Sequence, residues 1–311
     1  ISTLNRPDLV TRIYNNLSEQ SILPDEIILI EAKGEVFELG KVPGNLRERV
    51  KHHSLIGSSL TQAREYGMNN AKGELLFFFD DDVILPVNYI KDAIQYLDAN
   101  STVMGVGGVY KDEVVLHRSE KISAVSRFLQ VYDDGKKNKL LSSGWADYVR
   151  GKQQEIVTDA DWLFGCNFVL RASSFSKVNF ETNMRAWSFL EDVFLGAAFK
   201  QSFGSCMKVL PSLAVVHAPT ESAGQLSGIT LRMRVLYRYL LWRKYIKANN
   251  RRSLVNFSLG MLANIILTYK EKPSWGVLKI NWQTLRFVLG NPSMTWEEAN
   301  TYIFSKNTVV L

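Results

Sequence analysis

Apolar and polar residues follow two kinds of pattern along the first two thirds of the chain. Mainly apolar stretches that predict strands occur at residues 1–4, 26–30, 75–79, 103–110, 162–171 and 209–216. The stretch at residues 75–79 is continuously apolar, which is typical of a strand buried on both faces. Helical spacing of apolar residues occurs between these stretches, at residues 9–22, 58–71, 87–97 and from residue 189 onward. Strands that alternate with helices predict an α/β fold, in which helices flank a mainly parallel central sheet.

The pattern weakens at residues 32–57 and 111–161, where we expect loops and short elements. It changes character near residue 220, because residues 220–228 are small and polar, as in a mobile loop. Only helical patterns follow, at residues 229–247 and 254–269 and around Trp275, Trp282 and Trp296. We therefore expect two regions, an α/β domain over residues 1–220 and a helical C-terminal region over residues 221–311.

The charge of the chain is concentrated in that C-terminal region. The net charge is +6, yet residues 222–270, which we call the basic segment, contain no Asp or Glu. The segment carries nine basic residues: Arg232, Arg234, Arg238, Arg243, Lys244, Lys247, Arg251, Arg252 and Lys270. It predicts a local anionic partner such as phosphate, a lipid head group or nucleic acid.

Cellular location is constrained by three features of the sequence. Cys166 and Cys206 lack the spacing of a metal or redox motif and are expected to be reduced core thiols. No secretory signal is visible, so we expect a cytoplasmic protein. The apolar run at residues 254–269 is 16 residues long, which is short of the ~20 needed to span a bilayer. Peripheral attachment of the basic segment to the anionic inner face of the cell membrane remains an expectation.

Candidate chemistry begins where the strand at residues 75–79 runs into Asp80, Asp81 and Asp82. Three adjacent carboxylates repel one another, and burying them is costly unless a cation neutralises them. A divalent ion with oxygen ligands suits this place, because ligands of open α/β sheets bind at the carboxyl ends of strands. The alternative is a solvated acidic turn, which the five apolar residues before the aspartates disfavour.

Several stretches together resemble the GT-A-fold glycosyltransferases, in particular their inverting family 2. Residues 3–6 stand at the family's first strand and turn, residues 24–31 match its second strand, and residues 60–64 and 71–74 match the helix before the metal strand. Residues 80–82 match the Asp-X-Asp motif, residues 165–171 the acceptor-side strand, and residues 191–192 the catalytic acidic pair. The likeness spans residues 1–220 and implies a GT-A fold with a helical C-terminal extension.

The resemblance implies transfer of a sugar from a nucleotide-sugar donor, for which we expect a UDP-sugar. The acceptor would be a saccharide or a polyprenyl-linked molecule of bacterial cell-surface polysaccharide synthesis. Mn²⁺ or Mg²⁺ would be held by Asp82 and Asp80 and would stabilise the charge on the diphosphate leaving group. His217, which follows a predicted strand, either completes this metal shell or is a structural histidine.

The resemblance also assigns donor-binding and catalytic roles. Donor contacts fall on Thr3, Asn5, Arg6, Glu31, Arg64, Asp80 and Asp81. Glu31 would accept a hydrogen bond from uracil N3–H, although the family has Asp there, so the base of the nucleotide is left open. Arg64 either contacts the donor or forms an ion pair on its helix.

Asp192 is the expected catalytic base, which takes a proton from the acceptor hydroxyl, and Glu191 would contact acceptor hydroxyls. The alternative for both carboxylates is that they complement the dipole of the helix that starts here.

Three other functions are weighed against this one. A metal-dependent nucleotidyltransferase also uses paired carboxylates, but residues 3–7 contain no glycine for a phosphate loop. An NAD(P)-dependent enzyme is disfavoured because no G-x-G-x-x-G motif occurs. A nucleic-acid-binding module could use the basic segment, but no known motif supports it, and we expect no nucleic-acid partner.

Overall fold

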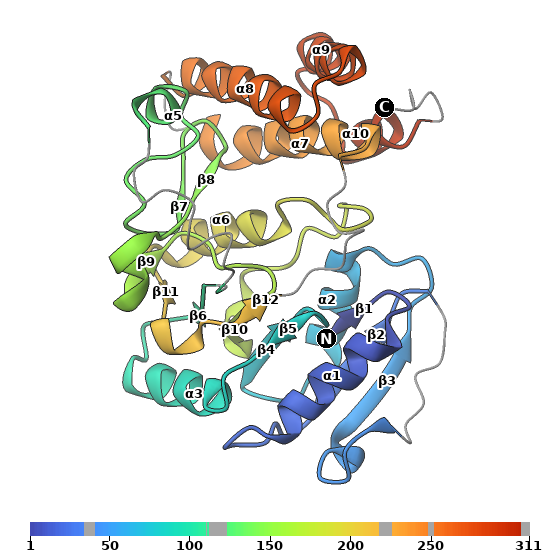
Figure 1. The fold of residues 1–311 in the computed structure, drawn as a ribbon, viewed down its shortest axis with the longest axis vertical. Coiled ribbons are helices and arrows are strands. Elements are labelled where there is room, and N and C mark those ends of the chain that lie inside the picture. The colour runs from blue at the N-terminus through green and yellow to red at the C-terminus, as the bar shows by residue number, and fades with distance from the viewer. Residues whose placement is uncertain (34–40, 110, 112–122, 218–225, 248–251, 306–311) are drawn as a thin grey trace. The chain divides into compact units, whose positions relative to one another are not determined.

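The computed structural model describes residues 1–33, 41–109, 111, 123–217, 226–247 and 252–305. It divides into two compact units, whose helices and strands are labelled in Figure 1. Unit 1 comprises Ile1–Glu120, Lys136–Asn138 and Val149–Pro219. Unit 2 comprises Lys121–Gly135, Lys139–Tyr148 and Thr220–Leu311. Two segments before residue 220 therefore belong to unit 2, which the sequence pattern did not indicate, and the assignment of separate domains stays a prediction.

The N-terminal part of unit 1 is a parallel three-stranded sheet in the order β1-β2-β3. Its strands and the two helices beside it are β1 (Ser2–Thr3), α1 (Pro7–Ser18), β2 (Ile27–Glu31), β3 (Val50–Ser54) and α2 (Leu60–Asn70). The expectation that residues 32–57 are irregular is wrong for β3, which pairs with β2 along its whole length. This strand carries Lys51, His52 and His53 in place of apolar residues, so its pattern was not recognisable.

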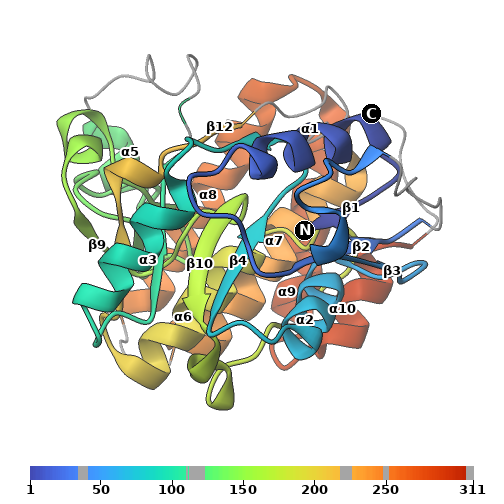
Figure 2. The same ribbon diagram turned by 90° about the horizontal axis from the view of Figure 1, so that it is seen from below.

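The second sheet of unit 1 has five strands in the order β4-β10-β6-β11-β9. These strands are β4 (Leu75–Phe79), β6 (Gly105–Gly107), β9 (Thr158–Ala160), β10 (Asn167–Arg171) and β11 (Met207–Val209). Among its neighbouring strands only β6 and β11 pair parallel, so this sheet is mixed, and Figure 2 shows β10 beside β4. A bridge between Ser2 and Asp80 joins β1 to the end of β4.

The core of this sheet forms around β4, as its apolar run predicted. Phe78 stacks on Phe168 of β10 with ring centroids 4.7 Å apart. Asn167, an amide inside an apolar strand, is fully buried, and its side-chain oxygen accepts hydrogen bonds from Gly108 N and Tyr89 Oη. Cys166 is a buried free thiol, and so is Cys206 next to β11.

Helices and short elements complete unit 1. The helices are α3 (Tyr89–Ala99) and α6 (Glu191–Phe203), and short 3₁₀ turns occupy Arg47–Arg49, Gly151–Glu155, Ala172–Ser176 and Pro211–Leu213. The two-residue strands β5 (Val83–Ile84) and β12 (Val216–His217) pair antiparallel, with His217 opposite Val83. This pairing brings a residue from the end of unit 1 next to the end of β4. The polar loop expected at residues 220–228 lies outside the described residues up to position 225.

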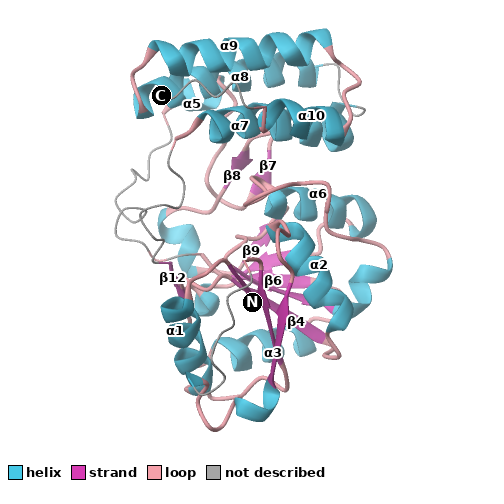
Figure 3. Ribbon diagram, turned by 90° about the vertical axis from the view of Figure 1, so that its right-hand side faces the viewer, coloured by secondary structure: helices cyan, strands magenta, loops and turns pink. Residues whose placement is uncertain are grey.

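Unit 2 consists mainly of helices (Figure 3). Its elements are α5 (Ala124–Phe128), β7 (Lys139–Leu140), β8 (Ala146–Asp147), α7 (Gly228–Leu241), a π-helical turn (Trp242–Ile246), α8 (Arg252–Glu271), α9 (Trp275–Gly290) and α10 (Trp296–Ile303). Helix α7 lies at the centre and buries twelve of its 14 residues. Among the helices that the structure describes, none combines the length and apolarity needed to cross a bilayer.

Candidate active site

The acidic cluster, which we define as Asp80, Asp81 and Asp82, lies directly after β4. The backbone N–H of Asp80 donates to the carbonyl of Cys166 at 3.1 Å, so the strand pairing with β10 extends to the first aspartate. The three carboxylates contact different residues, and the exposed fractions of their side chains differ. Asp80 is half-buried, whereas Asp81 and Asp82 are buried.

Asp80, Asp82 and His217 form a group with the composition of a metal site. One ligand atom from each residue lies within 4.8 Å of the others. His217 Nε2 is 3.1 Å from Asp82 Oδ1. Burial would raise the pKa of Asp82, but the hydrogen bond from His217 and the charge of Arg6 hold that pKa below its ordinary value. Two carboxylates and one imidazole are a donor set that suits Mn²⁺ and tolerates Mg²⁺, so the residues present fit a divalent ion.

Asp81 faces away from this group and fixes the turn after β1. Thr3 Oγ1 donates to Asp81 Oδ2 at 2.6 Å, and Arg6 Nη2 lies 2.9 Å from Asp81 Oδ1. Arg6 Nη1 also reaches Asp82 at 3.4 Å. Burial raises the pKa of Asp81 to about 6, against the effects of Thr3 and Arg6. Asp81 is 0% exposed, and the contact of its side chain with a donor stays a prediction.

Glu31 ends β2 and holds two neighbouring turns together. Its Oε1 accepts hydrogen bonds from the backbone N–H groups of Asn5, at 3.0 Å, and Lys33, at 2.9 Å. Asn5 has a φ of 52°, in the left-handed region, which asparagine adopts more readily than most residues. The contact between Glu31 and a nucleotide base stays a prediction.

Arg64 connects three elements around the acidic cluster. Its guanidinium pairs with Glu191 Oε1, lies 2.9 Å from Asp80 Oδ1 and donates to the carbonyl of Gly165 at 2.6 Å. It also lies over the ring of Phe168, with Cζ 5.3 Å from the centroid. Arg64 is therefore a salt-bridged residue of α2 whose partners lie outside that helix. A further contact to a donor stays a prediction.

Glu191 and Asp192 begin α6, and a strained loop precedes them. Ala186, Ser188 and Leu190 all have positive φ values, of 53°, 52° and 69°, which cost energy for residues other than glycine. The carbonyl of Ala186 accepts a hydrogen bond from Leu60 N at the start of α2, at 3.0 Å. Such strain concentrates at functional sites, where the surrounding structure holds the backbone in place.

The two carboxylates of α6 differ in what they face. Glu191 is buried against Arg64, and burial raises its pKa to about 7 despite Arg64. Its Oε2 has no hydrogen-bond partner among the residues that the structure describes. Asp192 is half-buried, and its two oxygens accept hydrogen bonds from Gly165 N, at 3.1 Å, and Val193 N, at 2.8 Å. Burial also raises the pKa of Asp192. A partly open carboxylate with a raised pKa suits general-base chemistry.

Gly165 is a site residue whose role the sequence did not reveal. Its N–H donates to Asp192 and its carbonyl accepts from Arg64, so its backbone links the acidic pair to the acidic cluster. A Cβ at this position would lie 2.5 Å from Glu191 Oε1. The one feature of the sequence that could have indicated this role is the presence of a glycine before the strand at residues 166–171. A role of the backbone N–H and carbonyl does not require a particular side chain, so it cannot be recognised from a residue pattern.

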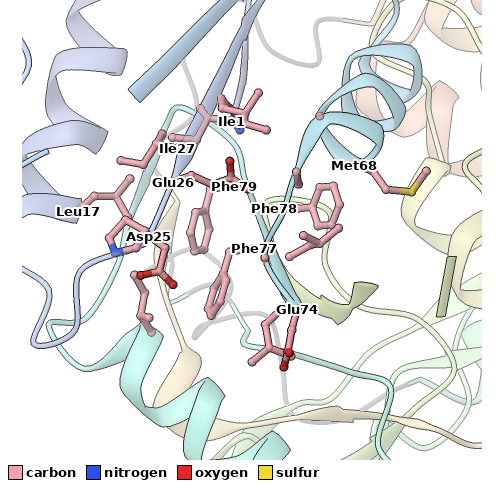
Figure 4. A pocket seen from close by; sticks show the side chains of 18 of the residues that line it. Ile1, Leu17, Asp25, Glu26, Ile27, Met68, Glu74, Phe77, Phe78 and Phe79 are labelled. Atoms are coloured by element: carbon pink, nitrogen blue, oxygen red, sulfur yellow. Dashed lines mark hydrogen bonds between the residues drawn. The ribbon is translucent and has the colours of Figure 1, made fainter. Parts of the chain in front are cut away.

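A cavity of about 500 Å³ lies between β2 and β4, apart from the metal-type group (Figure 4). Phe77 and Phe79 point into it from β4, opposite Ile27 of β2. It arises because β1 pairs only with the last two residues of β2, which leaves the earlier parts of β2 and β4 without a strand between them. Its lining is largely apolar and includes none of Asp81, Asp82, Asp192 and His217.

Comparisons with known proteins agree on one family and one fold. The family model described as glycosyl transferase family 2 matches residues 1–177. No curated protein sequence matches the chain. A solved structure of a mannosyltransferase, PcManGT from Pyrobaculum calidifontis in complex with GDP-Man and Mn²⁺, has a TM-score of 0.52 at 14% identity, over 97% of this chain and 83% of that one.

Two further solved structures are similar. S. aureus TarS 1–349 in complex with UDP-GlcNAc has a TM-score of 0.57 at 14% identity, over 91% of this chain and 78% of that one. GalNAc-T7 with UDP, GalNAc and Mn²⁺ has a TM-score of 0.52 at 18% identity, over 76% of this chain and 47% of that one. At such identities the likeness concerns the fold alone, and the expected GT-A fold is confirmed.

Proposed function

The chain belongs to glycosyl transferase family 2, and on that premise we propose that it is an inverting glycosyltransferase with a nucleotide-diphosphate donor. We take the donor to be a UDP-sugar and the acceptor to be a hydroxyl of a saccharide or lipid-linked molecule in bacterial cell-surface polysaccharide synthesis. The observation that carries the proposal is the gathering of Asp80, Asp82 and His217 at the end of β4. The complexes of the similar proteins with GDP-Man and with UDP-GlcNAc support a nucleotide-sugar donor, and the choice of UDP is our proposal.

Asp80, Asp82 and His217 would hold the Mn²⁺ or Mg²⁺ ion. When bound, such an ion acts as a Lewis acid that stabilises negative charge on a diphosphate leaving group. Arg64 would keep the carboxylate of Asp80 in place, because the two form an ion pair at 2.9 Å. Arg6 would add positive charge on the other side, next to Asp82.

Asp192 would act as the catalytic base. Its carboxylate would take the proton of the acceptor hydroxyl as the acceptor oxygen bonds to the anomeric carbon and the bond from that carbon to the diphosphate oxygen breaks. The N–H groups of Gly165 and Val193 hold the carboxylate in one orientation. General-base assistance of this kind contributes roughly 10²–10⁴-fold to the rate. Glu191 would contribute indirectly, by holding Arg64, or through the acceptor contact that the resemblance implies.

The remaining donor contacts are proposed for the ends of β1 and β2. Thr3, Asn5 and Arg6 border the acidic cluster, and Glu31 lies under the same turn. We assign the nucleotide to this side, with Glu31 nearest the base. A cytoplasmic location is proposed because buried free thiols such as Cys166 are usual in reducing compartments.

The test is calorimetric titration of the protein with UDP, GDP and other nucleotides, with Mn²⁺ or with a chelator. Tight binding of UDP only in the presence of Mn²⁺ is expected. Asp82→Asn should weaken this Mn²⁺-dependent binding by at least roughly 10–100-fold, the range seen when even an outer-shell group of a metal site is lost. Asp98→Asn, an exposed aspartate on α3, is the control and should change nothing. Equal nucleotide binding in chelator would contradict the metal assignment.

A further inference from the structure

The basic segment does not present all of its charges on one surface, because two of its arginines are buried. Arg232 is 6% exposed and donates to the carbonyl of Ile303, and Arg238 is 3% exposed and lies over the ring of Trp145. Arg234 forms an ion pair with Glu271. Arg232 and Arg238 therefore belong to the interior of unit 2, and Arg234 is already paired, so an anionic partner has to be sought on the outer helices.

Helix α8 carries an apolar strip on its outer side. Leu254, Val255, Leu262, Ile266 and Tyr269 are all exposed. At about 100° per residue, they lie within an arc of roughly 120° around the helix axis. Ser258 is the polar residue in the same arc, and Arg252 and Lys270 are exposed at its edge. An exposed apolar strip of this length on a protein surface indicates an interaction site.

Helix α9 carries a strip in which aromatic and basic residues alternate. Trp275, Lys279, Trp282, Arg286 and Leu289 are exposed and lie within an arc of roughly 80° at about 100° per residue. Trp275 is 86% exposed, Trp282 66% and Leu289 80%. Large apolar side chains with such exposure are unusual, and indole rings beside lysine and arginine are the composition of a membrane–water interface.

The two strips belong to neighbouring helices (Figure 3). The inner sides of α8 and α9 are joined by buried hydrogen bonds, in which Asn264 Nδ2 donates to Asn281 Oδ1 at 2.9 Å and Asn281 Nδ2 donates to Thr268 Oγ1 at 3.1 Å. The amides and Thr268 are buried, and each strip lies on the exposed side of its own helix. We call the two strips together the α8–α9 face.

We propose that the α8–α9 face docks on an anionic phospholipid bilayer, with both helices lying in the interfacial plane of the membrane. The apolar side chains would enter the boundary between head groups and acyl chains, and Lys279 and Arg286 would meet lipid phosphates and carboxylates. On the described part of α8 and α9 the one acidic side chain is Glu271, which is paired with Arg234. The charge of the face thus complements an anionic surface.

A second copy of the chain is the less suitable occupant. In a two-fold contact the same patch meets itself, so Lys279 and Arg286 would approach their own counterparts without acidic partners. A lipid surface supplies those partners. The inference concerns attachment and does not depend on the proposed donor, metal or catalytic base.

The test is flotation of the whole protein with vesicles, without substrate. The protein should float with phosphatidylcholine vesicles that contain phosphatidylserine at low salt, and much less with pure phosphatidylcholine or at high salt. Lys279→Glu with Arg286→Glu should weaken binding about 25-fold or more, because each basic residue near an anionic surface contributes about fivefold. Trp275→Ala with Trp282→Ala should weaken binding to both kinds of vesicle.

Arg47→Glu with Lys72→Glu is the matched control, because it makes the same charge change at exposed positions of unit 1. It should bind vesicles nearly as well as the unchanged protein. Unchanged thermal unfolding midpoints would show that the variants fold, and Leu262→Gln on α8 provides an independent variant if the double variants do not. The proposal is overturned by no flotation at low salt, by equal loss in the control, or by a dimer in sedimentation that Trp275→Ala with Trp282→Ala dissociates.

Discussion

Unit 1 brings its acidic cluster to one point, whereas unit 2 distributes its basic segment between the interior and the surface of a helical bundle. Asp80 and Asp82 meet His217 within 4.8 Å. Arg232 and Arg238, by contrast, are buried among the helices of unit 2. Each of the two stretches carries charges of a single sign in the sequence, but only the acidic cluster forms a site of concentrated charge.

The difference follows from the elements that carry the charges. Residues that follow the end of a buried strand must emerge at the same edge of the sheet, so three consecutive aspartates after β4 stay together whatever else the chain does. Residues spread along a helix turn by about 100° at each step, so their charges point to all sides unless the spacing is helical. On a helix, the spacing of the charged residues, and not their number, therefore indicates whether they form a charged surface.

The largest expected effect in this comparison is at the acidic pair of unit 1. Asp192→Asn should lower kcat by roughly 10²–10⁴-fold, because the amide cannot take the proton of the acceptor. Donor and Mn²⁺ binding, measured by calorimetry, should stay near normal. Glu297→Gln, in the first turn of α10, is the control for a carboxylate that only complements a helix dipole.

The rival explanation makes a different prediction for the same variant. If Asp192 served only the dipole of α6, Asp192→Asn would cost about 0.3–1 kcal/mol of stability and leave kcat unchanged, as expected for Glu297→Gln. Loss of donor binding with turnover retained would also remove Asp192 as the base.

Particular residues show how much of the fold could be predicted from the sequence. The central strand, the acidic cluster and the start of α6 were predictable, because each is a local pattern with a local physical cause. The strand β3 was not, because the polar residues Lys51, His52 and His53 occupy it and only pairing with β2 makes it a strand. The antiparallel direction of β10 was hidden as well, since apolar content does not reveal strand direction.

The residues of the site could be predicted from the sequence more readily than the contacts between them. Arg64 was identified, but nothing local shows that its guanidinium would reach Glu191, which lies 127 residues further along the chain. Gly165 acts through its N–H and carbonyl, which every residue has. The burial of Arg238 depends on how α7 is rotated in the bundle, and the charge pattern cannot report that rotation.

A pH profile sharpens the assignment of the base. Asp192 must be ionised to take a proton, and burial raises its pKa above the ordinary value of 3.8. As the pH falls through that raised pKa, kcat should fall tenfold per pH unit, and this decline should begin at a higher pH than an ordinary aspartate would allow. Saturating donor and Mn²⁺ keep the metal group bound during the measurement of kcat.

Glu191 titrates nearby, so it needs a control of its own. Burial raises its pKa to about 7, and Glu191→Gln removes this titration. An acid limb in kcat that persists in Glu191→Gln belongs to Asp192. If the acid limb disappears in Glu191→Gln, the titration that controls kcat belongs to Glu191 and not to Asp192.

Gly165→Ala tests whether the backbone link between the acidic pair and the acidic cluster is required. The new Cβ would lie 2.5 Å from Glu191 Oε1, so Glu191 and Arg64 would have to move. Overpacking of this kind costs about 1–3 kcal/mol of the free energy of unfolding. Gly44→Ala is the control, since nothing lies within 4 Å of its Cβ position. Equal denaturation midpoints for the two variants would contradict the crowding at Gly165.

The smallest effect is expected for a partly exposed arginine of the basic segment. Arg234→Gln removes an ion pair with Glu271, whose closest atoms are 2.7 Å apart, and pairs of this kind contribute about 0.2–1 kcal/mol. Its donor KM should be unchanged. Arg6→Gln, which removes a partly exposed arginine from the acidic cluster, should raise the donor KM and destabilise the protein more, because Asp81 would remain buried without its ion pair. If Arg234→Gln raised the donor KM as much as Arg6→Gln, a basic residue of unit 2 would reach the donor, and the contrast between the two units would fail.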